Sequence, residues 1–153
     1  MESDTLYGTG NLIVDEMANI SFTGNIVPPI WYKTIAKENG KPYLAAITIL
    51  SDIVYWYKPS EIRDEITGQL IGFKKKFHAD LLQRSYGQMA DLFGISKRQA
   101  IDATIFLEEK GVIKRVFRTI EQNGIQMNNV LFIELNTKRL KALTFPKVAP
   151  PPT

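Results

Sequence analysis

Apolar residues recur at intervals of three and four over residues 42–58 of this chain, which predicts a helix. Leu44, Ile47 and Leu50 start the pattern, and further apolar positions beside them widen the face. A helix that is apolar around most of its circumference belongs at the centre of a core. Shorter stretches with the same spacing predict two more helices, over 86–93 and 97–110.

Beyond Gly111 the pattern changes from helical spacing to alternation. Apolar and basic residues mix over 112–118, which predicts a strand with a basic outer face, and a return strand is expected over 127–135. The sequence Glu121-Gln122-Asn123-Gly124 between them is a hairpin signal. Ahead of the paired helices, residues 77–83 fit either a short strand or added helical turns.

The junction between the two shorter helices carries strong local signals. Ser85 and Ser96 are placed to cap the two helices through their hydroxyl groups. Gly94 supplies the left-handed backbone of a sharp exit, and Ile95 is expected to plug the corner. Ala90 is small enough to let the helices cross closely. This order of elements is that of a winged helix-turn-helix, whose second helix enters a DNA groove.

We therefore predict a mainly α-helical fold with a small β-hairpin, a winged helix-turn-helix with an N-terminal extension. Its expected parts are an extension over 1–41, the winged helix-turn-helix over 42–145 and a proline-rich linker over 146–153. Within the extension, residues 12–27 look extended or irregular, and 30–38 a short helix.

Two further segments complete the expected layout. Residues 60–76 interrupt the domain, with a short helical turn capped by Ser60 and a turn at Thr67-Gly68. Near the end of the chain, Thr137 is expected to cap a short basic helix.

Charge divides the chain into two unlike halves. Residues 1–73 hold 5 basic against 9 acidic residues, a net charge of −4, whereas residues 74–153 hold 14 against 7, a net charge of +7. A basic half favours a polyanionic partner such as nucleic acid over a merely solvated surface.

Composition argues against several other classes. The chain has no cysteine, which excludes disulfides and thiolate metal sites and fits a cytoplasmic location. It has no apolar run long enough for a membrane span, and its acidic start is unlike a secretory signal. The single histidine, His78, has no nucleophile or metal-ligand partner nearby, and no phosphate-binding loop is present. We expect no enzyme activity, no metal and no cofactor.

The second of the paired helices offers a candidate DNA-reading face. Ala100, Ala103 and Leu107 share the face expected to pack on the first helix, together with Thr104. The outward positions near its N-terminal end are Lys97, Arg98, Gln99 and Asp102. Arg98 and Gln99 have the donors and acceptors to read guanine or adenine in the major groove.

Other basic side chains are expected to contact phosphates, which gives affinity and register but no sequence preference. These candidates are Lys74, Lys75, Lys76, Arg84, Lys114, Arg115 and Arg118, with Lys138 and Arg139 as further ones. About half of them are expected to be ordinary solvated side chains.

Ile101 and Ile105 lie well round the helix from its core face, one turn apart. An exposed apolar pair of this kind predicts an interface, covered either by the N-terminal extension or by a second subunit. Aromatic residues are also dense early in the chain. Stacking on single-stranded bases is one use for them, but most flank or occupy the apolar helix, which favours core packing.

The run from Phe77 to Asn136 resembles the winged-helix domain of replication-initiation proteins from bacterial phages, plasmids and integrated elements. It is also similar to the N-terminal domain of DnaD-like primosome proteins. The resemblance rests on SYGQMADLFGISKRQAIDATIFLEEKGVIKR, on the basic strand and short wing, and on NNVLFIELN as the return strand. The preceding ILSDIVYWY helix also fits.

The resemblance implies DNA binding in the initiation of replication of a phage, plasmid or integrated element. Double-stranded DNA is the expected partner, with single-stranded DNA, a second copy of the chain and a replisome protein as further ones. Two alternatives stay open. One is a transcription regulator, and the other is a replisome scaffold that uses the same fold for protein contacts.

Overall fold

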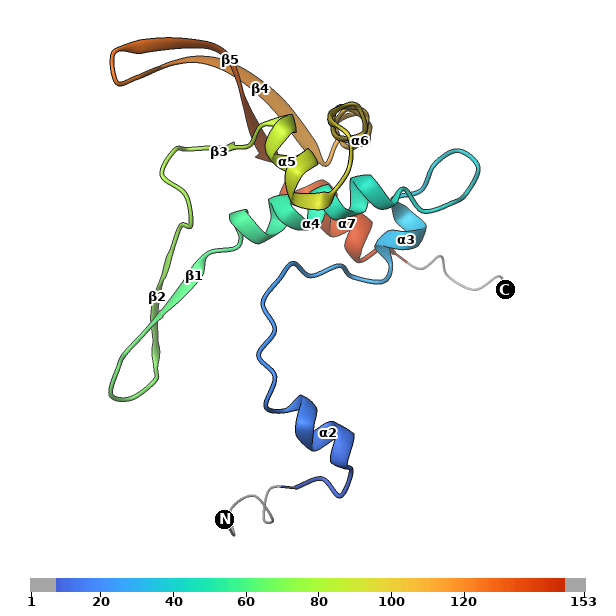
Figure 1. Ribbon diagram of the computed structural model, residues 1–153, viewed down its shortest axis with the longest axis vertical. Helices are drawn as coiled ribbons and strands as arrows, with labels where there is room; N and C mark the ends of the chain where they lie inside the picture. Colours follow the sequence, from blue (N-terminus) through green and yellow to red (C-terminus); the bar gives the residue numbers. More distant parts are fainter. Residues whose placement is uncertain (1–7, 148–153) are drawn as a thin grey trace.

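The computed structural model describes residues 8–147. Within that range the chain forms six helices and five strands (Figure 1). The helices are α2 (Leu12–Met17), α3 (Trp31–Thr34), α4 (Leu44–Tyr57), α5 (Tyr86–Phe93), α6 (Lys97–Glu109) and α7 (Thr137–Thr144). The strands are β1 (Ser60–Arg63), β2 (Leu70–Lys74), β3 (Leu82–Gln83), β4 (Ile113–Gln122) and β5 (Ile125–Leu135).

The core forms around α4, which lies at the centre of the folded body (Figure 1). Ile47, Ile49, Leu50 and Ile53 of this helix are buried, as its apolar circumference predicts. Helices α3 and α6 and strands β3 and β5 pack against α4, and α5 and β4 add further buried residues to the same core.

The turn between α5 and α6 follows from the local signals in the sequence. Ser85 and Ser96 each accept a hydrogen bond from the backbone N–H three residues on, of Gln88 and Gln99 respectively. Both glutamine side chains return a hydrogen bond to the capping residue, so each helix starts in a full capping box. Gly94 adopts the left-handed conformation, with φ of 65°. The two predicted helices and the glycine turn between them are confirmed.

The sheet beside these helices has the strand order β3-β5-β4, antiparallel throughout. Asn123 and Gly124 both have positive φ and form the tight turn between β4 and β5, so the predicted hairpin turn is confirmed. Farther down the hairpin the register shifts between Arg118 and Ile120, opposite Asn129, which also has positive φ. This bulge adds a residue to one strand and bends the distal half of the hairpin.

The prediction of a mainly α fold with a single small hairpin is wrong. The described residues are 38% helix and 24% strand, a mixed α/β composition with two small antiparallel sheets. The second sheet is the β1–β2 hairpin, in the segment where a short helical turn was expected. Asp64 accepts hydrogen bonds from the backbone N–H groups of Ile66 and Thr67, which organises a turn between two strands where a helix start was expected.

Helix α3 joins the folded body although it lies within the expected extension. Trp31 and Ile35 are buried in the core, and the Trp31 indole N–H donates a hydrogen bond to Thr144 of α7 at 3.0 Å. Thr34 donates a second hydrogen bond to the Leu143 carbonyl. The expected boundary after residue 41 therefore falls between two helices that share one core.

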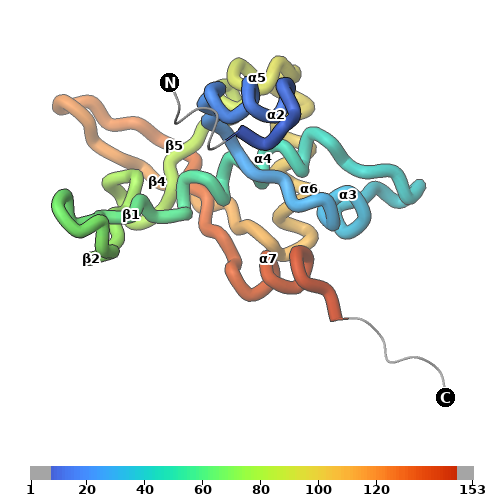
Figure 2. Tube along the Cα trace, turned by 90° about the horizontal axis from the view of Figure 1, so that it is seen from below, coloured from blue at the N-terminus to red at the C-terminus, as the bar shows by residue number. Residues whose placement is uncertain are grey.

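Residues 8–26 lie apart from that core. Figure 1 shows α2 standing off the folded body on a long extended connection, and none of its residues is buried. The two hairpins β1–β2 and β4–β5 also project from the body, toward the same side in both views (Figures 1 and 2). The expected linker over 146–153 lies almost entirely outside the described residues.

Candidate nucleic-acid interface

Helix α6 presents two chemically different sides. Its inner side is buried and consists of the small or apolar residues Ala100, Ala103, Thr104 and Leu107, as predicted. Lys97 and Arg98 are exposed in its first turn, at the end nearest the turn from α5. Exposed cations in the first turn of the second helix are suited to bring that end of the helix to a DNA groove.

The neighbours of these two cations limit what each can do. Arg98 is 78% exposed and forms an ion pair with Asp102 across one helical turn at 3.3 Å, a contact of the weak surface kind. Gln99 is exposed, but its side-chain oxygen accepts the Ser96 N–H in the capping box. Reading adenine with both amide atoms of Gln99 would break that cap, so Arg98 is the stronger candidate for base contact.

A hollow of about 480 Å³ opens beside Lys97, between the start of α5 and one face of the β4–β5 hairpin. Phe117, Met127 and Asn129 line its hairpin side. Phe117 is exposed although it sits on a strand of the sheet. An apolar ring, a thioether and an amide in a hollow next to a cation can accommodate a sugar or a base edge of a nucleic acid.

Arg115 reaches α6, not the solvent. Its guanidinium donates to the Glu108 carboxylate at 2.9 and 3.0 Å and to the Tyr86 hydroxyl at 3.1 Å. Burial raises the pKa of Glu108, but the hydrogen bonds from Arg115 outweigh it and hold that pKa below its ordinary value. Arg115 therefore fixes the hairpin to both helices of the helix-turn-helix.

Arg118 is held on the opposite face of the sheet. Its guanidinium lies over the Phe132 ring and donates two hydrogen bonds to Asp80, at 2.6 and 2.9 Å. The hydrogen bonds from Arg118 lower the pKa of Asp80 to about 2. A guanidinium paired in this way contributes little net charge to a phosphate-binding surface.

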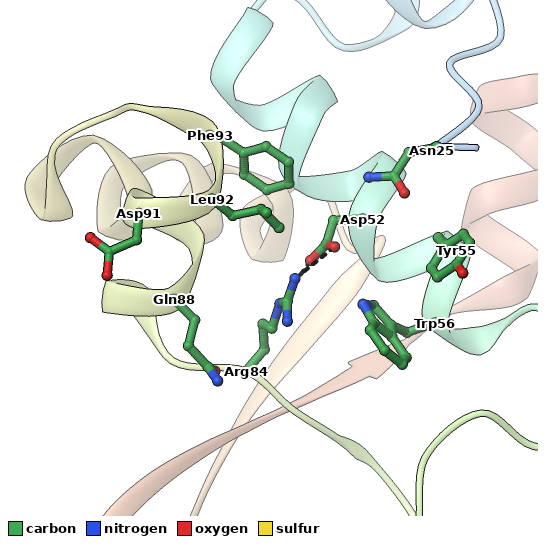
Figure 3. A pocket seen from close by; sticks show the side chains of 10 residues that line it. Asn25, Asp52, Tyr55, Trp56, Arg84, Gln88, Asp91, Leu92 and Phe93 are labelled. Carbon is green, nitrogen blue, oxygen red and sulfur yellow. Dashed lines mark hydrogen bonds and ion pairs between the residues drawn. The ribbon is translucent and has the colours of Figure 1, made fainter. Parts of the chain in front are cut away.

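Arg84 is the most deeply placed of the expected phosphate ligands. Figure 3 shows it beside Asp52 of α4, at the floor of a groove between α4 and α5. Only 14% of the Arg84 side chain and 3% of the Asp52 side chain are exposed. The guanidinium neutralises a buried carboxylate, which is a structural role.

The lysine run follows β2 and leads away from α6. Lys74 is exposed at the end of the strand. Lys75 donates hydrogen bonds to the carbonyls of His78 and Ala79. The Lys76 ammonium donates to the Tyr55 carbonyl and lies 3.8 Å from the centre of the Tyr55 ring. These contacts fold the run against the loop that precedes β3.

The remaining basic candidates lie near the opposite end of α6. Lys114 is exposed on β4, in register with Glu134 of the neighbouring strand. Lys138 and Arg139 are exposed on α7, where the Arg139 guanidinium crosses Gly111. The structure thus places Lys97 in the lining of the hairpin hollow, with Arg98 next to it in the first turn of α6, and it places Lys114, Lys138 and Arg139 elsewhere.

Ile101 and Ile105 are half-buried. Neither belongs to the core or to the partly buried residues packed against it, so they occupy an intermediate position on α6. They are less exposed than the sequence pattern predicts.

Sequence reasoning missed the apolar side of the candidate interface. Phe117, Met127 and Asn129 belong to two strands, and only their pairing in the sheet places them beside Lys97. The available signal was the alternation along 112–118, which places Phe117 on the same face as Ile113 and Arg115. We had expected that strand to present a basic outer face.

Within residues 8–147, no cluster of three or more histidine or acidic side chains is arranged to hold a metal ion, and no helix is long and apolar enough to cross a membrane. Comparisons of the chain with protein-family models, curated proteins and solved structures found no match. A function has therefore to be inferred from the geometry of the chain's own residues.

Proposed function

We propose that this protein binds double-stranded DNA through the first turn of α6 and the adjoining face of the β4–β5 hairpin. The observation that carries the proposal is the exposed pair Lys97 and Arg98 at the start of α6, on the second helix of a capped helix-turn-helix. The helix and the hairpin are fixed relative to each other by the Arg115 contacts with Glu108 and Tyr86. Such a rigid pair of elements can follow a duplex groove.

In this proposal, fewer basic residues contact DNA than the sequence predicts. Arg84, Arg115 and Arg118 each form an ion pair with a carboxylate, so their charges are largely neutralised within the protein. Lys97 and Arg98 then carry the main electrostatic attraction at this face, supported by the exposed hollow of the hairpin. With few phosphate contacts, we expect modest affinity with a shallow dependence on salt.

The biological setting proposed is the initiation of replication of a phage, plasmid or integrated element. Its support is the resemblance of residues 77–136 to winged-helix replication-initiation proteins, stated above on the sequence. A transcription regulator would use the same contacts with DNA.

Fluorescence anisotropy of a labelled duplex, titrated at several salt concentrations, tests the proposal. We expect binding that weakens with salt and that is lost in the variant Lys97→Ala, Arg98→Ala. Lys33→Ala removes an exposed cation from α3, away from the interface, and serves as the control. Absence of binding at low salt, or equal binding by the double variant, would refute the proposal.

A scaffold role in a replication complex is the second candidate, and the β1–β2 hairpin favours it. Five large apolar residues of this hairpin are exposed, namely Ile62, Ile66, Leu70, Ile71 and Phe73. An exposed apolar surface of this size is typical of protein contacts. If the protein shows no affinity for DNA, this hairpin is the surface to test for a protein partner.

A further inference from the structure

The N-terminal arm, defined as residues 8–26, leaves an unusual amount of apolar surface uncovered. Seven large side chains along it are between 46% and 78% exposed, namely Leu12, Ile13, Val14, Met17, Ile20, Phe22 and Ile26. A short helix such as α2 is marginal in water unless its apolar side is packed. This arm therefore needs a surface on which to bury these side chains.

A matching groove lies between α4 and α5 on the same chain, with a volume of about 730 Å³. Figure 3 shows Tyr55 and Trp56 on one side of this groove, Leu92 and Phe93 on the other, and the Arg84–Asp52 pair at its floor. Leu92 is 57% exposed. The arm touches the groove only at its root, where Gly24 and Asn25 form part of the rim.

We infer that the protein forms a dimer in which each arm docks into the α4–α5 groove of the other copy. Each copy carries one apolar arm and one apolar groove, so reciprocal exchange satisfies both surfaces and closes with two-fold symmetry. Each arm leaves the body beside the groove of its own copy, and the partner's arm would enter that same groove. The two exchanged arms would therefore lie close to each other.

The area of the arm is sufficient for a stable dimer. At about 60–120 Å² for a fully exposed large apolar side chain, the seven partly exposed residues present on the order of 400 Å², and each copy would bury its groove as well as its arm. A standard protein interface buries about 800 Å² per partner, and two exchanged arms double the contribution.

The chemistry of the two surfaces agrees with this pairing. Residues 8–26 carry only two charges, Asp15 and Glu16, and both belong to α2. Thr9 donates to Asp15 through its backbone N–H and its hydroxyl, which ties this carboxylate to the start of the helix. The segment from Ile20 to Ile26, next to the groove, is uncharged and can enter it without burying an unpaired ion.

Multi-angle light scattering of the full chain without DNA tests this dimer independently of the proposed DNA binding. We expect twice the mass of the chain at micromolar concentration. The variants Ile13→Asp, Phe22→Asp in the arm and Leu92→Asp in the groove should each raise the dissociation constant about tenfold or more, because a carboxylate would enter an apolar contact. Leu44→Asp, at the exposed start of α4 and outside the groove, should leave the mass unchanged. Circular dichroism checks that each variant is folded.

Cross-linking then identifies the contact, because the chain has no cysteine of its own. A Phe22→Cys protein mixed with a Leu92→Cys protein should form a mixed disulfide, and such a bond can only join two copies. A mass equal to one chain, a dimer insensitive to the arm and groove variants, or the absence of the mixed disulfide would each overturn the inference. A dimer disrupted by Ile101→Glu, Ile105→Glu but not by the arm variants would do so as well.

Discussion

Arg84 donates two hydrogen bonds to Asp52, from Nε at 2.9 Å and from Nη2 at 2.8 Å, across the groove between α4 and the start of α5. The two residues are 32 positions apart in the chain. Their bidentate contact joins the central helix α4 to the short segment between β3 and α5. The pair therefore holds the start of α5 beside α4.

Removing one member of this pair is expected to be costly. In Asp52→Ala the guanidinium of Arg84 loses its partner in a largely buried place, and we expect the free energy of unfolding to fall by about 3–5 kcal/mol. Replacing both residues, as Asp52→Leu with Arg84→Met, should cost much less than the single change. Urea denaturation of the three proteins measures both effects, and additive losses would contradict the coupling.

Gly94 is required by the turn between α5 and α6. Its backbone has a φ of 65°, which residues other than glycine adopt at a cost in energy. Gly94→Ala should therefore destabilise the protein by about 1–2 kcal/mol. Gly87→Ala is the matched control, because Gly87 lies within α5 and an added Cβ would meet nothing closer than the Ser85 hydroxyl at 3.9 Å. It should stabilise the helix by up to about 1 kcal/mol. Thermal melts of both variants compare the two positions.

Arg98 and Arg115 are expected to respond oppositely to replacement by alanine. Arg98 is exposed with only a weak ion pair, so Arg98→Ala should leave stability nearly unchanged and weaken DNA binding by about 1–3 kcal/mol, the loss expected for a base contact. Arg115→Ala removes three side-chain hydrogen bonds to Glu108 and Tyr86, so its main effect should be a lower free energy of unfolding. Anisotropy titrations and urea melts on both variants separate the two roles. Equal loss of stability in both would contradict this assignment.

Asp80 makes part of the stability depend on acid pH. Its folded pKa of about 2 lies below the ordinary value of 3.8, because Arg118 hydrogen-bonds the carboxylate. The contribution is therefore complete above pH 3.8 and is lost as the pH falls toward about 2. Asp80→Asn should be less stable than the parent at neutral pH, and the difference should disappear in that acid window. A difference that persists at the lowest pH would show that the carboxylate charge is not responsible.

The Trp31–Thr144 hydrogen bond holds α7 against α3. Thr144→Val removes the acceptor but keeps the shape, so the buried indole N–H is left without its partner. We expect a loss of about 1–3 kcal/mol in the free energy of unfolding and a change in Trp31 fluorescence. Thr137→Val is the control, because Thr137 is exposed in the first turn of the same helix and the cap is Asn136, not Thr137 as the sequence predicts. An equal effect of the two changes would argue against a specific role for this bond.

The sequence by itself determined the helix-turn-helix and the turn of the β4–β5 hairpin. Their signals are local: two serine caps with glutamines three residues on, one glycine at the corner, and an Asn-Gly turn between alternating strands. The same local reasoning failed over 60–74. There, the residues expected to start a helical turn instead form a hairpin, and the fold is mixed α/β.

Only the tertiary structure decided which charges remain available to a partner. Arg84 and Arg118 find their carboxylates 32 and 38 residues away, and Arg115 folds back on α6, so a count of basic residues overstated the DNA-facing charge. The apolar hollow beside Lys97 likewise exists only because β4 and β5 pair in one register. Local signals act through neighbouring backbone groups, whereas ion pairs and grooves join segments whose meeting depends on the whole fold.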